Sequence, residues 1–133
     1  MNEVMSRQCP FCKIIESDST NRIIDQNDLG FVIYDSYPIN EGHTLIIPKR
    51  HISSFFEITH EERNALLSLL DSAKTILNNE FKPNSYNIGI NDGKAAGQTV
   101  PHLHIHLIPR YQGDMEDARG GVRWIFPDKA KYW

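Results

Sequence analysis

The chain has 133 residues, 40% of them apolar, and a formal net charge of −3 at pH 7. This size fits one domain around a single core, and the apolar fraction excludes an intrinsically disordered chain. The mild acidity provides no basic surface for a nucleic acid polymer, and no apolar run reaches the roughly 20 residues that span a bilayer. We therefore expect a single domain over residues 1–133 without a membrane partner. Because residues 1–8 contain no apolar signal region, we expect it in the cytoplasm.

The predicted elements come as neighbouring, hairpin-like strands with one long helix inserted among them. A short helix is expected over 13–17. Thr59 and Glu62 have the spacing of a capping box, and apolar positions then recur every three or four residues until the helix stops near Asn79. Strands are expected over 22–25, 30–34, 43–48, 86–90 and 101–109. This order lacks the alternation of a parallel sheet and predicts an α+β fold, an antiparallel sheet of about five strands with the helices on one side.

Three histidines alternate with aliphatic residues in the last of these strands, Pro101-His102-Leu103-His104-Ile105-His106-Leu107-Ile108-Pro109. Because successive strand side chains point to opposite faces, this alternation predicts three imidazoles on one face. Histidine titrates near neutral pH and is the most common metal ligand. The residues alone leave three interpretations open: a solvated polar face, a catalytic metal held by His-x-His, or covalent catalysis by one imidazole.

A polar, glycine-containing loop over 91–99 leads directly into the histidine run. Such a loop can turn backbone N–H groups toward an anion. It is not a Walker A loop, because Gly93-Lys94 is followed by alanine and no helical pattern comes after it. An ordinary hairpin loop is the alternative, but beside three histidines we favour a phosphate site.

The two cysteines of the chain, Cys9 and Cys12, are separated by two residues. Two cysteines are too few for a disulfide scaffold. A closed zinc site with two histidines from elsewhere is the preferred interpretation, ahead of buried thiols without a ligand. A redox pair ranks last, because it needs a preceding strand and only eight residues precede Cys9.

Taken together, these residues resemble the histidine-triad (HIT) superfamily, and the match covers most of the chain. The matching segments are Phe11-Cys12-Lys13-Ile14-Ile15, Tyr34-Asp35, the run from Gly42 to His51, Asn91-Asp92-Gly93, Gly97-Gln98-Thr99-Val100 and the histidine run. The resemblance implies an α+β fold with an antiparallel sheet. It also implies a nucleotide hydrolase or transferase that acts at an α-phosphate, and a homodimer.

The resemblance implies a role for individual residues. His104 is similar to the nucleophile, whose Nε2 attacks phosphorus to give a nucleotidyl-histidine intermediate. His106 resembles the residue that contacts the phosphate and stabilises the leaving group, and His43 resembles a fourth histidine that supports the triad. The expected substrate ligands are Asn91, Gln98 and Thr99 for phosphate, Asp35 for ribose, and Phe11, Ile14, Tyr34 and Leu45 for the base.

Some microbial members of the superfamily carry a structural zinc, and this chain has residues that match its ligands. They are Cys9, Cys12, His51 and His102. The three histidines of the run would then have different roles, since His102 would bind zinc while His104 and His106 face the substrate. We expect a structural zinc and not a Lewis acid.

The resemblance implies hydrolysis of dinucleoside polyphosphates of the diadenosine type with release of AMP, a purine nucleotide. Gln98-Thr99 favours this branch. The alternatives are an adenosine phosphoramidate hydrolase, a nucleotide-binding module without significant turnover, and a hydrolase that holds a catalytic metal on the three histidines.

Overall fold

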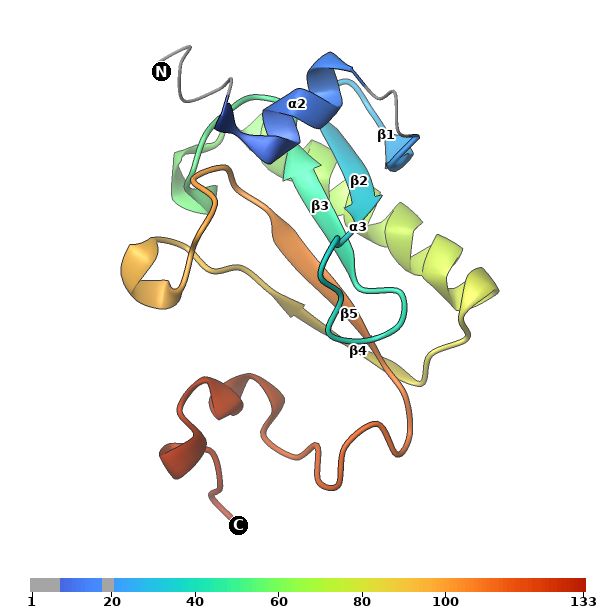
Figure 1. Cartoon of the computed structure of the whole chain (residues 1–133), viewed down its shortest axis with the longest axis vertical. Helices are drawn as coiled ribbons and strands as arrows, with labels where there is room; N and C mark the ends of the chain where they lie inside the picture. Colours follow the sequence, from blue (N-terminus) through green and yellow to red (C-terminus); the bar gives the residue numbers. More distant parts are fainter. Residues whose placement is uncertain (1–7, 18–20) are drawn as a thin grey trace.

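The computed structural model describes residues 8–17 and 21–133 (Figure 1). The helices are α2 (Pro10–Glu16) and α3 (His60–Glu80), and the strands are β1 (Ile23–Gln26), β2 (Gly30–Tyr34), β3 (Thr44–Pro48), β4 (Ser85–Gly89) and β5 (Ile105–Arg110). Short 3-10 turns are η1 (Phe55–Glu57), η2 (Lys94–Ala96), η3 (Gly121–Ile125) and η4 (Pro127–Lys129). All strand pairs are antiparallel, in the order β1-β2-β3-β5-β4. The predicted α+β class with five strands, one long helix and one short helix is confirmed.

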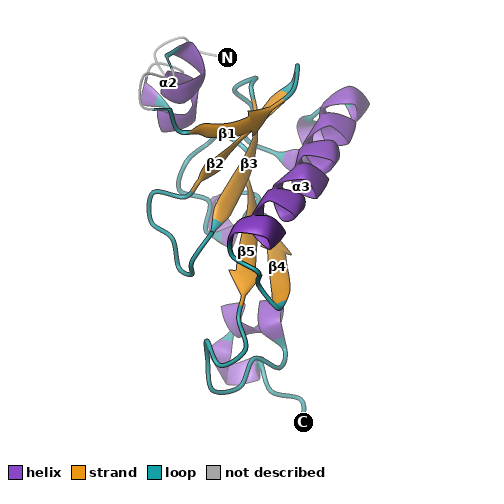
Figure 2. Ribbon diagram, turned by 90° about the vertical axis from the view of Figure 1, so that its right-hand side faces the viewer, coloured by secondary structure: helices purple, strands orange, loops and turns teal. Residues whose placement is uncertain are grey.

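The two helices lie on opposite faces of the sheet, which corrects the expectation of helices on one side (Figure 2). Val32 of β2 packs in a core with Leu66, Leu69 and Leu77 of α3. Its neighbours in β2 pack instead with α2 and the cysteines. Because both faces are covered, β2 and β3 are buried along almost their whole length and read as unbroken apolar runs rather than alternating ones.

The capping box at the start of α3 is confirmed and also positions the loop before it. The Thr59 hydroxyl accepts from the Glu62 backbone N–H, and the Glu62 carboxylate accepts from the Thr59 N–H. The same buried carboxylate accepts two hydrogen bonds from Arg50, at 3.0 and 2.7 Å. These bonds from Arg50 lower the pKa of Glu62 to about 2. The segment that carries His51 is thereby tied to the first turn of α3.

The start of β2 packs closely against α3 at a glycine. A Cβ atom at Gly30 would lie 2.9 Å from methyl carbons of both Leu66 and Leu69. These leucine side chains would have to shift, and the Cβ would also lie 3.2 Å from the Ile47 carbonyl oxygen, so a side chain here would disturb the packing of α3 against β2.

Strand β5 begins later than the alternation of histidines predicts. It starts at Ile105, and only His106 of the three histidines lies within it. The segment before it is irregular, held by the Leu103 N–H, which donates to the Ile52 carbonyl at 2.7 Å. Side chains still alternate through this segment, since Leu103 and Ile105 are buried in the α3 core. The histidine run therefore keeps its two-residue period without being a continuous strand.

Residues 111–133 extend beyond the end of β4 and β5 and include η3 and η4 (Figure 1). This segment exposes several large apolar side chains, among them Val122, Ile125 and Phe126. Within the described residues, neither helix combines the length and the apolarity that crossing a bilayer requires.

Candidate functional site

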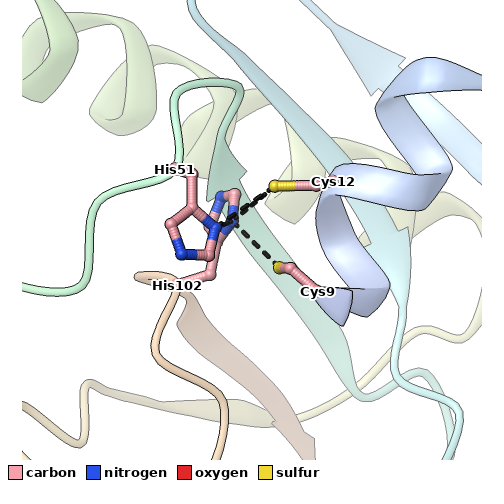
Figure 3. A group of neighbouring side chains, drawn as sticks. All are labelled: Cys9, Cys12, His51 and His102. Atoms are coloured by element: carbon pink, nitrogen blue, oxygen red, sulfur yellow. Dashed lines mark hydrogen bonds between the residues drawn. The ribbon is translucent and has the colours of Figure 1, made fainter. Parts of the chain in front are cut away.

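The predicted metal ligands converge from three parts of the chain (Figure 3). Cys9 and Cys12 flank the start of α2, His51 follows β3, and His102 precedes β5. Cys9 Sγ lies 3.3 Å from His102 Nδ1, and Cys12 Sγ lies 3.2 Å from His51 Nδ1. The two Nδ1 atoms are 3.2 Å apart, and all four candidate ligand atoms lie within 4.8 Å of one another. The two thiol sulfurs and two imidazole nitrogens therefore surround one common position, where a metal ion could be bound.

This donor set and its spacing fit a closed zinc site. Tetrahedral ligands with Zn–S near 2.3 Å and Zn–N near 2.0 Å lie roughly 3.3–3.8 Å apart. The separations of 3.2 to 3.6 Å between these donor atoms fall close to that range. With two sulfur and two nitrogen donors, the protein itself fills four positions and leaves none for substrate.

A backbone carbonyl sets the protonation of His102. Its Nε2 lies 2.7 Å from the Pro48 carbonyl oxygen, which only accepts, so Nε2 carries the proton and Nδ1 offers its lone pair to the cysteines. Burial lowers the pKa of His102 to about 4, which keeps the ring in the neutral form that binds metals. The carbonyl therefore acts as the outer partner that a ligating histidine usually has.

A cavity of about 320 Å³ lies beside the metal ligands on the α2 face of the sheet. Its lining combines apolar side chains with two of the three histidines of the run. The residues that line it are Pro10, Phe11, Ile14, Arg22, Ile33, Asp35, Ser36, Tyr37, Leu45, Asn91, Gly97, Thr99, Val100, His104 and His106. The structure thus brings together most of the predicted catalytic and binding residues.

The nitrogen that His104 offers to this cavity carries a lone pair. Its Nδ1 lies 2.8 Å from the carbonyl oxygen of His102, so Nδ1–H donates to that oxygen. In the neutral ring Nε2 is then unprotonated. This is the form that a nucleophilic imidazole needs.

The neighbouring His106 has the opposite protonation, set through His43. The backbone N–H of Ile39 donates to His43 Nδ1, so the proton of the neutral ring is on Nε2. That Nε2 lies 2.9 Å from His106 Nδ1 and donates to it. His106 then carries its own proton on Nε2. Two histidines that line one cavity therefore present a lone pair and an N–H donor.

Asp35, His43 and His106 also lie close enough to hold a metal, but their hydrogen bonds argue against that. Asp35 Oδ2 is 3.4 Å from His43 Nε2. A metal on this Nε2 would require the proton on Nδ1, where it would face the Ile39 N–H. We therefore read these residues as a hydrogen-bonded chain.

Tyr34 was expected in the wall of the base pocket, and the structure places it elsewhere. Its ring packs against the α3 core, edge-to-face with Phe81, and its hydroxyl donates to Glu80 at 2.7 Å. Ile33 lines the cavity instead. The reason is strand parity, because Ile33 and Asp35 share one face of the chain and Tyr34 points to the other.

Gln98 was expected to bind phosphate, but its side chain is engaged within the loop. Its Oε1 accepts from the Gly93 N–H, and its Nε2 donates to the carbonyls of Ser53 and Val100. The N–H groups of Ala96, Gly97 and Gln98 also donate to loop carbonyls. Four backbone N–H groups of the predicted phosphate loop thus donate within the loop, and the Gln98 amide is also engaged. Asn91 and Thr99 do line the cavity.

Two further contributions escaped sequence reasoning. Arg22 lines the cavity while donating to the Tyr34 carbonyl at 3.0 Å, and nothing in its local sequence indicates this. The Ile39 N–H orients His43, and a backbone donor leaves no mark on side-chain patterns. The sequence did contain a signal for Ile33, because the two-residue period of a strand places it on the same face as Asp35.

Acid should destabilise the fold through His106. Burial first, and then His104 and His43, lower its pKa to about 4, while Asp35 opposes the shift. The unfolded chain, with a histidine pKa near 6.5, binds more protons between these values, so stability falls as pH drops through that window. When the pH falls from 7 to 4.5, the free energy of unfolding of His106→Asn should decrease less than that of the native protein. We expect a difference on the order of 1–3 kcal/mol. Urea denaturation at both pH values measures this, and equal losses would contradict it.

Comparison with known proteins places the chain in a family. The HIT domain model matches residues 16–113. An uncharacterized HIT-like protein of Methanocaldococcus jannaschii is 36% identical over 113 residues, 85% of this chain and 87% of that protein. An AP-4-A phosphorylase of Mycobacterium tuberculosis is 31% identical over 115 residues, 85% of this chain and 59% of that protein. A Zn-bound histidine triad family protein from Mycobacterium smegmatis has a TM-score of 0.75 and 34% identity, over 84% of this chain and 81% of that one. The protein belongs to the HIT domain family.

Proposed function

We propose that this protein is a nucleotide hydrolase that cleaves dinucleoside polyphosphates at the α-phosphate and releases AMP. The observation that carries the proposal is the opposite protonation of His104 and His106 in one cavity. A lone pair beside an N–H donor suits attack on phosphorus with stabilisation of the departing oxygen.

In the first step, His104 Nε2 attacks the α-phosphorus and forms a P–N bond while the bridging P–O bond breaks. The electron pair of the broken bond leaves with the polyphosphate, and the His106 N–H donates a hydrogen bond to this charge. Water then attacks the phosphorus, the P–N electron pair returns to His104, and the water proton passes to solvent. AMP and a nucleoside polyphosphate are the products.

The same protonation favours an anhydride over an amine as the leaving group. His106 is neutral, because burial lowers its pKa to about 4, so it donates a hydrogen bond but gives up its proton only with difficulty. A polyphosphate departs as an anion without needing that proton, whereas an amine must be protonated. The AP-4-A phosphorylase relative, which is named for a substrate of this class, supports the same choice.

The cavity provides a place for each part of the nucleotide. Phe11, Ile14 and Leu45 form an apolar wall suited to the base. Asp35 lines the same cavity beside His43, and we assign it to the ribose hydroxyls. We assign Asn91 and Thr99, which also line the cavity, to the phosphate oxygens. We assign zinc to the four cysteine and histidine donors as a structural ion, in keeping with the Zn-bound relative.

A second hollow across the loop suits the remaining phosphates. It shares Gly97 and Thr99 with the first cavity and adds the cationic Lys94. Replacing this charge by Lys94→Gln should raise KM for diadenosine tetraphosphate roughly three- to fivefold. It should leave an adenosine phosphoramidate almost unaffected, because that leaving group carries no phosphates. Lys74→Gln on α3 is the matched control.

A turnover panel that pairs diadenosine polyphosphates with adenosine phosphoramidates tests the proposal. We expect higher kcat/KM on the polyphosphates, with AMP as one product. Preference for the phosphoramidates would establish the alternative branch. AMP binding without turnover of any substrate would instead identify a nucleotide-binding module.

We also propose that the protein forms a homodimer through the β4 edge of the sheet. β4 is an outer strand, and Ile88 on it is 51% exposed. The neighbouring C-terminal segment adds exposed Val122, Ile125 and Phe126. Sedimentation equilibrium tests this, and an Ile88→Lys variant should be monomeric if the edge is the interface.

A further inference from the structure

The metal centre and the nucleotide cavity share one short segment of chain. The turn from Cys9 to Cys12 supplies two of the four metal donors. The two residues between them, Pro10 and Phe11, line the cavity. A movement of this turn that changes one site must therefore change the other.

The Phe11 ring lies between a metal ligand and the nucleophile. It is 8% exposed, and its edge-to-face contacts reach His102 at 5.6 Å and His104 at 5.1 Å between ring centroids. Edge-to-face pairs have a preferred geometry, so the ring restricts the orientation of the imidazole it touches.

A second connection runs through the backbone. The carbonyl of the metal ligand His102 accepts the Nδ1–H of His104, which fixes the ring that we identify as the nucleophile. The side chain of the same His102 is held between Cys9 and the Pro48 carbonyl. Fixing His102 at the metal therefore also fixes the acceptor that orients His104.

We propose that Phe11 is a positioning residue that couples the metal centre to nucleotide binding. A metal that draws Cys9 and Cys12 toward His51 and His102 seats Phe11 against His104 and closes the base wall. A nucleotide that packs on Phe11 holds the same turn in its metal-binding geometry. This inference rests on the proposed nucleotide site, and it adds that zinc and nucleotide each strengthen the binding of the other.

Reciprocity makes the coupling measurable. The factor by which AMP tightens zinc must equal the factor by which zinc tightens AMP. We expect about fivefold or more for the native protein, measured by competition with a chromophoric chelator at saturating AMP and without AMP. In Phe11→Leu, which keeps an apolar side chain but loses the ring, the factor should fall close to one while zinc still binds. Phe56→Leu, at a ring that is 76% exposed, is the matched control and should keep the native factor.

Cobalt replaces zinc in a second measurement that needs no variant. The visible bands of Co²⁺ on two cysteines and two histidines report the geometry of the site, and AMP should shift them. If the metal-free protein unfolds, or if Phe11→Leu does, this spectrum decides the question. Unchanged bands at saturating AMP, or an equal zinc affinity with and without AMP, would overturn the coupling. Failure of the metal-loaded protein to bind AMP at all would instead refute the proposed function.

Discussion

Replacing His104 by alanine is expected to lower turnover of diadenosine tetraphosphate by at least about 10³-fold. The substitution removes the imidazole lone pair that the proposed mechanism uses for attack on phosphorus, and His106 cannot replace it because it presents an N–H. Without the nucleophile, only direct attack by water remains, and the hydrogen bond from His106 helps that reaction little.

Binding of AMP should change far less than turnover in this variant. The substitution leaves the side chains of the proposed base wall, Asp35, Asn91 and Thr99 unchanged, although Phe11 loses its ring contact with His104. We expect the AMP dissociation constant to change by less than about tenfold, because one polar contact contributes about 1 kcal/mol. Calorimetry on His104→Ala measures this.

A matched control and a direct observation complete the test. His60→Ala changes an exposed histidine in the first turn of α3 and should turn over normally. Reactions of the native protein quenched with denaturant at alkaline pH, where a P–N bond to histidine survives, should contain an adenylyl group on a peptide with His104, detected by mass spectrometry. Catalysis that survives in His104→Ala, or a quenched reaction without the adduct, would refute covalent catalysis.

Residue type and spacing were sufficient to predict the architecture, and together with the resemblance they predicted the members of the candidate metal centre. The capping box at Thr59 and Glu62, and the apolar period after it, determine α3 locally. The antiparallel pairs follow from short apolar runs separated by turns. Cys9 and Cys12 carry a recognisable spacing, and the resemblance supplied His51 and His102, which the structure brings to the same point.

Orientation could not be predicted in the same way. The expectation for Tyr34 identified a position but ignored the two-residue period of β2, which turns its side chain toward α3. Gln98 was assigned by its place before the histidine run, yet its amide bonds to its own loop. The start of β5 was misplaced because His102 is pulled toward the cysteines, a long-range contact that no local pattern contains.

Removing Cys9, a proposed metal ligand, should lower the melting temperature strongly but change kcat only slightly. A ligand that binds only the folded state stabilises it by about 4 kcal/mol when its concentration is a thousand times its dissociation constant. For a domain of this size that corresponds to a fall in Tm on the order of 10–20 °C. We expect Cys9→Ala to lose bound zinc, measured by atomic absorption, and to melt at a correspondingly lower temperature. At a temperature where it is folded and diadenosine tetraphosphate is saturating, its kcat should stay within about tenfold of the native value, because the proposed nucleophile, His104 Nε2, is not one of the metal donors.

Chelation separates the loss of metal from the loss of a buried thiol. Cys9 is 4% exposed and packs with α2, so Cys9→Ala also removes buried contacts whatever the metal does. A strong chelator should lower the Tm of the native protein by nearly the full amount but should barely change that of Cys9→Ala, since the two treatments remove the same ion. If the chelator destabilises both proteins equally, the ion does not sit on Cys9. If it stops turnover at once while the melting temperature is unchanged, the metal is catalytic and the structural assignment is wrong.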